Sequence, residues 1–182
     1  MQKNERLELT ITDLSEEGLG IGKKDGFVWL VKGALIGDRI LAQALKLKKH
    51  YGFARLIELL SPSPDRVEAP CRIAGQCGGC QLQSLKYSAQ LKFKTRKLFT
   101  DLCWIGGVEE AFLREISDPI VGMENPLRYR NKAQYPIARD RMGRPAAGFY
   151  AGRSHRLIPC EDCLIGAEEN RDILSILLRW ME

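Results

Sequence analysis

The sequence predicts a mixed α+β protein, in which a small β-barrel of the OB type at residues 1–61 precedes a small α+β domain at residues 65–182. Three observations predict this order. Residues 7–60 carry short apolar–polar alternations separated by glycine-rich turns, which is typical of a small closed barrel. A Ser-Pro-Ser-Pro run then interrupts regular structure. The rest of the chain mixes helical periodicity with extended segments that are rich in cations.

The strands of the predicted barrel follow one another closely. Residues 7–12 alternate apolar and polar side chains with a period of two, as a half-buried strand does. Gly18, Gly20 and Gly22 indicate bends or bulges of a coiled sheet. No helix start follows them, so they are not a dinucleotide-binding fingerprint. Lys24-Asp25-Gly26 signals a hairpin turn, and further strands are predicted over residues 27–31, 39–45 and 53–60.

A basic connection precedes the last of these strands. Lys48 and Lys49 are followed by His50 and then by Tyr51. Cations beside an exposed aromatic side chain suit single-stranded nucleic acid, because the cations follow the phosphates and the ring stacks on a base. The alternative is an ordinary solvated loop, and the sequence favours neither interpretation. Ser61-Pro62-Ser63-Pro64 then predicts a stiff linker at a domain boundary.

Three cysteines come directly after the linker, at Cys71, Cys77 and Cys80. Thiolates are soft ligands that suit zinc, copper(I) and iron–sulfur centres. The five-residue gap before Cys77 exceeds the two to four residues usual in structural zinc sites, which favours iron–sulfur without excluding zinc. Gly78 and Gly79 are expected to supply positive φ angles and to let backbone N–H groups reach the sulfurs.

The other cysteines lie far from this group in the sequence. Cys160 and Cys163 are both candidates for a fourth ligand, and either would tie the end of the chain to its middle. Cys103 lies among apolar residues and is predicted to be a buried small hydrophobe. Three unrelated thiols or a disulfide framework are the alternatives. They are disfavoured because the first residues of the sequence contain no apolar signal core.

Helices are predicted on both sides of a second extended region. They span residues 84–102, with Ser84 as N-cap, then 108–116 and 168–182, the last with an apolar face of Ile173, Ile176, Leu177 and Trp180. Between them, residues 129–137 and 148–159 are predicted to be extended, and residues 139–145 to form a loop. The cations of this region that are candidate RNA ligands are Arg128, Arg130, Lys132, Arg153, His155 and Arg156. Such a mixture of cations and aromatics suits looped RNA. The pattern alone slightly favours the alternative, a half-exposed sheet whose arginines and lysines simply face solvent.

Bulk composition narrows the class of partner. The formal net charge of +5 and the pI of about 8.9 permit an anionic partner without requiring one. No stretch approaches the roughly 18 apolar residues of a membrane span. We therefore expect a cytoplasmic protein with no membrane association, and the sequence shows no sign of an obligate protein partner.

Cys-x5-Cys-Gly-Gly-Cys-Gln at residues 71–81 closely resembles the iron–sulfur motif of bacterial 23S ribosomal RNA uracil-C5 methyltransferases. Residues 1–61 look like the TRAM domain of that family, and residues 125–132 and 148–155 are similar to signatures of its central domain. The resemblance implies a [4Fe–4S] cluster on Cys71, Cys77, Cys80 and Cys163, since Cys163-Leu164-Ile165 matches the setting of the family's fourth cysteine better than Cys160 does.

The same resemblance implies a methyltransferase function, and it implies that these residues lack the domain that carries it out. Family members add a thiolate to uracil and methylate C5 with S-adenosylmethionine, in a Rossmann-like domain that has no counterpart in these 182 residues. No catalytic residue is therefore assigned, and the chain alone is expected to be inactive. It would grip ribosomal RNA around a flipped base. Transfer RNA is less expected, because related transfer RNA enzymes typically lack the barrel and the cysteine motif.

Two other functions remain as alternatives. One is a stand-alone, non-catalytic RNA-binding protein that holds an iron–sulfur cluster or zinc. The other is a radical methylthiotransferase, which also joins a TRAM domain to a cluster. It is disfavoured because here the barrel precedes the cysteines, and because their spacing is x5 then x2 rather than x3 then x2.

Overall fold

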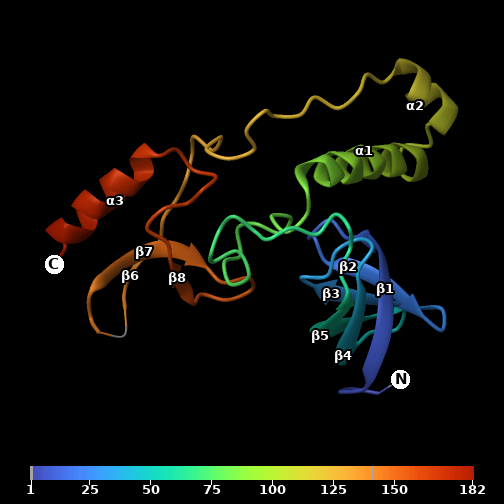
Figure 1. Ribbon diagram of the computed structural model, residues 1–182, viewed down its shortest axis with the longest axis horizontal. Helices are drawn as coiled ribbons and strands as arrows, with labels where there is room; N and C mark the ends of the chain where they lie inside the picture. Colours follow the sequence, from blue (N-terminus) through green and yellow to red (C-terminus); the bar gives the residue numbers. More distant parts are fainter. Residues whose placement is uncertain (1, 141) are drawn as a thin grey trace.

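Strands β1 to β5 close an amino-terminal barrel in the computed structural model, which describes residues 2–140 and 142–182 (Figure 1). Around the barrel the order is β1-β2-β3-β5-β4, and β3 and β5 are the parallel pair. Met1 and Arg141, which belong to the predicted barrel segment and to the predicted 139–145 loop, lie outside the described residues. The strands are β1 (Arg6–Leu14), β2 (Gly20–Lys24), β3 (Phe27–Lys32), β4 (Arg39–Leu47) and β5 (Tyr51–Ser61). The predicted barrel is confirmed.

Alternation along the strands fills the barrel. Leu7, Leu9 and Ile11 of β1 point inward and are at most 3% exposed, while their neighbours in the strand face solvent. Trp29 is fully buried and lies against the backbone of Gly52 on the adjacent strand. A Cβ atom at position 52 would approach the Trp29 ring to 2.5 Å, so only glycine fits opposite this indole.

The hairpin signal at Lys24-Asp25-Gly26 is also confirmed. Asp25 and Gly26 have φ angles of 50° and 77°, and they connect β2 to β3 with the twist that two-residue hairpins favour. The glycine-rich run before it forms the start of β2, where Gly20 pairs with Val31 of the next strand.

A buried ion pair fastens the segment after β5 to the barrel. Asp38 is fully buried and accepts hydrogen bonds from the backbone N–H groups of Leu35 (2.7 Å) and Ser63 (2.9 Å). Arg66 donates to the same carboxylate and also to the carbonyl of Gly33 at 2.8 Å. Ser63, in the predicted linker, is therefore buried against the barrel.

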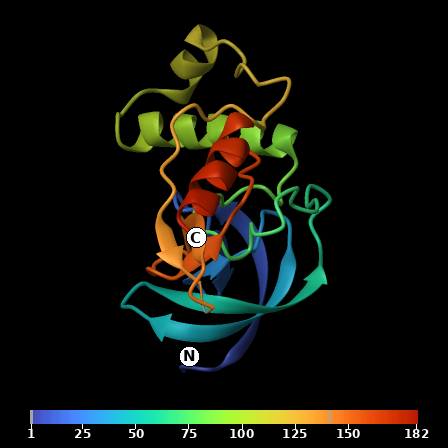
Figure 2. The same cartoon turned by 90° about the vertical axis from the view of Figure 1, so that its left-hand side faces the viewer.

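Helix α1 (Tyr87–Trp104) lies over one end of the barrel (Figures 1 and 2). Leu14 and Leu35 of the barrel pack with Leu85 just before the helix, and Phe93 of the helix packs against this cluster. Lys97 adds an ion pair to Glu16 of the barrel at 3.1 Å. The barrel and α1 thus share a second, smaller apolar core.

The helix begins later than predicted. Its N-cap is Lys86 rather than Ser84, and no side chain caps it. Ser84 is occupied in the preceding turn, where its carbonyl accepts the N–H of Val67 at 2.9 Å. Cys103, predicted to be buried, is only partly buried, on the side of α1 that faces α2 (Glu110–Ile116).

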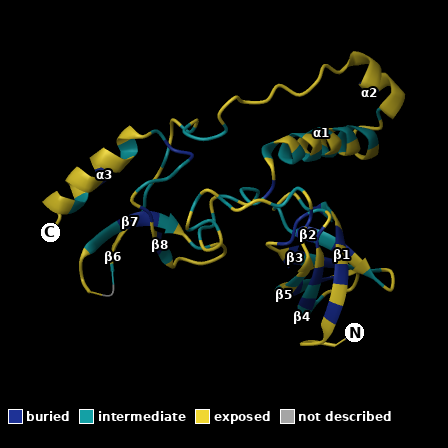
Figure 3. Ribbon diagram, viewed as in Figure 1, coloured by how far each residue is buried: buried dark blue, intermediate teal, exposed yellow. Residues whose placement is uncertain are grey.

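The rest of the chain forms a small antiparallel sheet and a last helix. Residues 129–136, predicted to be extended, contribute only an isolated bridge at Arg130, and β6 begins at Ile137. The predicted apolar face of the last helix is uncovered among the described residues, where Trp180 is 84% exposed (Figure 3). The elements are β6 (Ile137–Arg139), β7 (Pro145–Tyr150), β8 (Leu157–Pro159) and α3 (Glu169–Trp180). Within the described part of the chain, no helix has the length and apolar character needed to cross a bilayer.

Candidate metal centre and nucleic-acid interface

The cysteine loop, residues 71–80, is built from consecutive turns. Ala74 donates its N–H to the carbonyl of Cys71 (3.1 Å), and Cys77 donates to that of Ile73 (2.8 Å). Gly79 then donates its N–H to the sulfur of Cys77 at 3.3 Å. The expected contact between backbone N–H groups and a sulfur is therefore present before any ligand is bound.

The glycines of this loop serve a different purpose from the predicted one. Neither Gly78 nor Gly79 has a positive φ angle. Gly78 is required by close approach instead, because a Cβ atom there would lie 2.9 Å from the carbonyl oxygen of Tyr150 and 3.0 Å from Gly152. The Gly78 N–H donates to that same carbonyl at 2.9 Å, and Cys77 bridges to Ala151. The cysteine loop is thus joined directly to the end of β7.

The second pair of cysteines follows β8. Cys160 is buried and donates its backbone N–H to Ala147 at 3.0 Å. A hydrogen bond from the Cys160 thiol lowers the pKa of Cys163 to about 6, against the effect of burial, and the N–H groups of Ile165 and Gly166 and the charge of Arg130 act in the same direction. The same hydrogen bond, together with burial, raises the pKa of Cys160. Cys163 is therefore the more readily formed thiolate.

Cys71, Cys77 and Cys80 lie within electrostatic range of this pair. Burial raises the pKa of Cys80, and the thiols of Cys163, Cys77 and Cys71 raise it further, while a hydrogen bond with Gln83 opposes them. Gln83 also accepts the N–H of Cys71 at 3.3 Å. Nowhere in residues 2–140 and 142–182 do three His, Cys, Asp or Glu side chains converge closely enough to share one metal ion. The fold nevertheless gathers five cysteines from two distant segments and leaves out Cys103, which lines the groove between α1 and α2.

Arg128, predicted as an RNA ligand, clamps the loop that carries these two cysteines. Its guanidinium donates two parallel hydrogen bonds to the Asp162 carboxylate, at 2.6 and 2.8 Å, and a third to the carbonyl of Cys163 at 3.2 Å. Asp162 raises the pKa of Arg128 further, and the arginine in turn lowers the pKa of Asp162. Sequence reasoning missed Asp162, because nothing local in the sequence couples it to position 128.

The predicted ligands on the barrel lie at one hairpin. Lys48 and Lys49 occupy the turn between β4 and β5, where Lys48 donates its N–H to the carbonyl of Tyr51 at 2.8 Å. Tyr51 meets Phe53 edge to face, with ring centroids 5.6 Å apart. The sequence analysis did not select Phe53, although its alternation with Tyr51 on one face of a strand is a signal that could have found it.

Arg153 connects the small sheet to this aromatic pair. Its guanidinium lies over the Phe53 ring, 5.7 Å from the centroid, and forms an ion pair with Glu17 of the barrel at 2.5 Å. His155 packs edge to face on Tyr150, with centroids 5.5 Å apart. The structure therefore places Arg153 over Phe53, a barrel residue that lies far earlier in the sequence.

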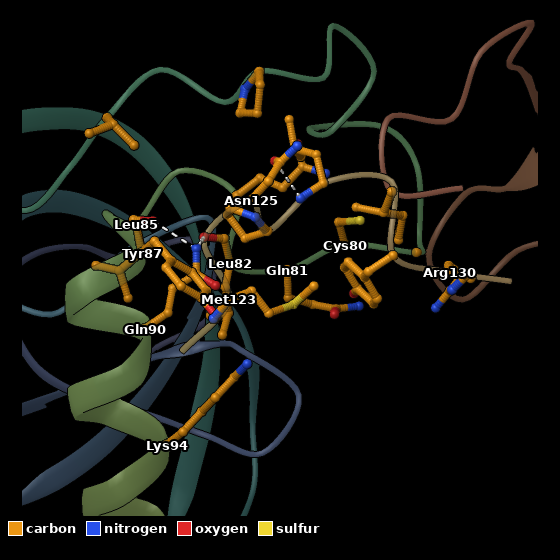
Figure 4. Close-up of a pocket in the computed structure, with 18 residues that line it drawn as sticks. Cys80, Gln81, Leu82, Leu85, Tyr87, Gln90, Lys94, Met123, Asn125 and Arg130 are labelled. Carbon is orange, nitrogen blue, oxygen red and sulfur yellow. Dashed lines mark hydrogen bonds between the residues drawn. The ribbon is translucent and has the colours of Figure 1, made fainter. Parts of the chain in front are cut away.

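The remaining predicted RNA ligands are Lys132, Arg156 and Arg130. Lys132 and Arg156 are exposed, and within the described residues neither forms an ion pair. Arg130 donates its backbone N–H to Ile165 at 2.8 Å, and its side chain lies at one end of a cavity beside Cys80 (Figure 4).

Comparison with known proteins agrees with this arrangement. The TRAM domain family matches residues 2–57, the segment that forms the barrel. The chain is 45% identical over 174 residues to a protein of Halalkalibacterium halodurans named as an uncharacterized RNA methyltransferase, covering 96% of this chain and 37% of the relative. A protein of Clostridium tetani with the same description is 41% identical over all 182 residues, which is 38% of its length.

Among solved structures, a Pyrococcus abyssi tRNA (uracil-54, C5)-methyltransferase in complex with S-adenosyl-L-homocysteine shares the fold. It has a TM-score of 0.61 and 24% identity, and the match covers 96% of this chain and 36% of that one. The match thus takes in nearly all of this chain.

The chain spans somewhat more than a third of the length of the curated relatives it matches. The resemblance stated from the sequence is confirmed at the level of a TRAM domain and of RNA methyltransferase relatives. The chain thus contains a TRAM domain and is similar, over nearly its whole length, to part of proteins named as RNA methyltransferases.

Proposed function

We propose that this chain is the RNA-recognition portion of an S-adenosylmethionine-dependent RNA uracil-C5 methyltransferase, and that its RNA is 23S ribosomal RNA. The observation that carries the proposal is the gathering of Cys71, Cys77, Cys80 and Cys163 beside a TRAM barrel. The uracil-C5 chemistry is supported by the motif Cys-x5-Cys-Gly-Gly-Cys-Gln, and the ribosomal substrate is supported by the same motif alone.

A [4Fe–4S] cluster fits the donors of this site. Four thiols with a hydrogen bond from Gly79 to one sulfur form a soft, N–H-rich set of the kind that iron–sulfur clusters use. The five-residue gap between Cys71 and Cys77 is longer than the gaps usual in structural zinc sites, which favours a cluster over zinc.

When bound, the cluster would supply Fe–S bonds that join the cysteine loop to the loop after β8. The protein's own residues already prepare this junction. Gly78 holds the cysteine loop against Tyr150, and Arg128 fixes the second loop through Asp162. The cluster would then be structural, and the cations around it would position the RNA. We assign no catalytic residue here and expect these 182 residues alone to bind RNA without transferring methyl groups.

The cluster is tested by anaerobic reconstitution of the chain with iron and sulfide. We expect broad visible absorbance and near-stoichiometric iron and sulfide, whereas zinc without sulfide would refute the cluster. Cys163→Ala should lose more iron than Cys160→Ala, because Cys160 is buried and donates to Cys163. The reverse order would exchange the two roles.

RNA recognition is tested by measuring affinity for fragments of 23S ribosomal RNA and for transfer RNA across a salt series. Tight binding that weakens steeply with salt is expected, since phosphate contacts release counterions. A preference for the ribosomal fragments would support the proposed substrate, and a preference for transfer RNA would replace it. No binding at low salt would overturn RNA recognition altogether.

A further inference from the structure

A cavity of about 500 Å³ lies between α1, the cysteine loop and residues 123–130 (Figure 4). Its size falls in the range of pockets that hold small molecules, roughly 300–1,000 Å³. Cys80 is the one proposed cluster ligand among the described residues that line it, and none of the predicted barrel ligands Lys48, Lys49 and Tyr51 lies there.

The charge of the cavity is positive. Lys94 of α1 and Arg130 lie toward opposite ends in Figure 4, and no Asp or Glu is among the described residues that line it. Neither cation forms an ion pair with any described residue, in contrast to Arg96 and Lys97 of the same helix, which pair with Asp13 and Glu16 of the barrel. Two unpaired cations at the ends of one cavity favour an anion that reaches from one to the other.

The lining of the cavity also holds apolar, aromatic and amide side chains. They include Tyr87, Tyr129, Leu82 and Met123, together with the carboxamides of Gln90 and Asn125. Tyr129 is 53% exposed, and within the described residues its ring makes no aromatic contact. An exposed ring in the same cavity as carboxamides suits a nucleobase, because the ring stacks on the base and the amides bond to its edge.

The walls are also held in place by the fold. The Tyr87 hydroxyl accepts the N–H of Met123 at 2.9 Å, and its own proton remains to be donated. Gln90 donates to the carbonyls of Leu82 (3.1 Å) and Leu85 (2.9 Å), which leaves its oxygen as an acceptor. Asn125 accepts the N–H of Leu127 at 3.1 Å through its side-chain oxygen, so its NH₂ group is the part left for a ligand. A site that is formed in advance loses less entropy on binding.

We propose that this cavity receives one unstacked nucleotide of single-stranded RNA, with its base against Tyr129 and its flanking phosphates on Lys94 and Arg130. The inference rests on the proposed function, because it assumes that the chain binds RNA. It adds a base-reading site that is distinct from Tyr51 and Phe53 on the barrel. An RNA strand that occupies both would pass over the junction of the barrel, α1 and the cysteine loop.

The first test compares variants in binding to a single-stranded RNA of about 12 nucleotides, a length that matches such binding sites. Lys94→Gln should weaken binding several-fold and reduce the slope of log K against log salt by about 0.7, the value for one lost phosphate contact on a single strand. Tyr129→Ala should weaken binding by roughly tenfold without changing the slope, since it removes stacking. Lys92→Gln is the matched control, because Lys92 lies on the same helix but lines the groove that faces α2. It should leave affinity unchanged.

The second test locates the base directly and does not depend on how the variants fold. The same RNA carrying one 5-iodouridine is cross-linked to the unmodified chain by ultraviolet light, and the modified peptide is identified by mass spectrometry. A cross-link within residues 81–94 or 123–130 is expected. Iron content is also measured for each variant. A variant that has lost iron is not used to judge the inference, and the cross-link then decides it.

The outcomes separate this inference from the proposed function. If the unmodified chain does not bind RNA at low salt, the proposed function fails and the inference fails with it. If the chain binds RNA, the cross-links fall only in the barrel, and Lys94→Gln and Tyr129→Ala bind as tightly as the unmodified chain, the inference alone is overturned.

Discussion

The barrel and the region after it are stabilised in different ways. In the barrel, Leu9, Trp29 and Ile40 are at most 2% exposed and belong to one continuous core. After residue 86, α1 has no buried residue among those described, and Trp104 and Trp180 are 85% and 84% exposed. The second region is held by specific ties instead, such as Gly78 to Tyr150 and Arg128 to Asp162. Apolar burial thus dominates in the barrel, whereas in the other region only scattered apolar residues such as Ile158 and Leu174 are buried and polar contacts around the cysteines contribute a larger share.

This difference separates two kinds of surface. A barrel with its own core is expected to keep its shape whether or not a ligand is bound. Large exposed apolar side chains, such as those on α3, are typical of surfaces that another molecule covers. The cysteines lie where the two regions meet, so their ligand is expected to stabilise mainly the second region.

The largest expected effect comes from removing iron from the reconstituted chain. Trypsin should then digest residues after about position 66 on the order of tenfold faster, because this region has a much smaller apolar core than the barrel and opens locally once its junction is lost. The barrel should survive as a resistant fragment, which gel electrophoresis and mass spectrometry would detect.

Cys103→Ala is the matched control for this digestion, since Cys103 lies outside the cysteine group. It should retain the iron content and protease resistance of the unmodified chain. Equal digestion of both regions, with or without iron, would mean that the second region does not depend on the cluster more than the barrel does.

The next effect is the loss of the largest side chain in the barrel core. Trp29→Ala should reduce the free energy of unfolding of the barrel by about 3–5 kcal/mol, because it leaves a cavity against Gly52 and its neighbours. Urea unfolding followed by circular dichroism measures this change.

Trp180→Ala provides the same substitution in the other region. Because Trp180 is 84% exposed, the free energy of unfolding should change by no more than about 0.5 kcal/mol. Similar losses at both tryptophans would show that α3 is covered in solution.

The smallest effect is a pH dependence of the barrel. Burial raises the pKa of Asp38, but hydrogen bonds from Arg66, Ser63 and Leu35 outweigh it, so the pKa is lowered in the folded state. The unfolded chain then binds the proton more readily. Stability from this group is complete above the ordinary pKa of 3.8 and is lost as the pH falls below it.

A loss on the order of 1 kcal/mol is expected in this acid range, measured as a fall in the melting temperature of the barrel. Asp38→Asn should have a lower melting temperature at neutral pH and a flatter acid dependence. Glu8→Gln, which removes an exposed ion pair to Arg39 at 3.1 Å, should change neither. An acid dependence that Asp38→Asn leaves intact would assign the effect to another carboxylate.

Prediction from the sequence succeeded where local pattern determines structure. Alternation in residues 7–12 and the turn at Asp25-Gly26 led directly to β1 and to the β2–β3 hairpin. It failed at the start of α1, because Ser84 is a good N-cap locally but is held by Val67 in the preceding turn. Tertiary contacts decide such boundaries, and one sequence does not display them.

The candidate site divides in the same way. The spacing of Cys71, Cys77 and Cys80 indicated a ligand group, because their chemistry is local. The role of Arg128 was not predictable, since its partner Asp162 is distant in sequence and an arginine near aromatics is equally typical of RNA binding. For Gly78 the residue was selected for the wrong reason, because the approach of Tyr150 depends on the fold of β7.

The contact between Arg66 and Asp38 also has a consequence for biosynthesis. A chain leaves the ribosome from its amino terminus, and domains fold as they emerge. Every residue that closes the barrel, including Arg66, is made before Cys71. Cys163 follows only after α1, α2 and the small sheet. While the residues between Cys80 and Cys163 are being made, a nascent chain would therefore carry a finished barrel and three thiols that lack their downstream partner, and oxidants have their best access to the cysteine loop during that interval.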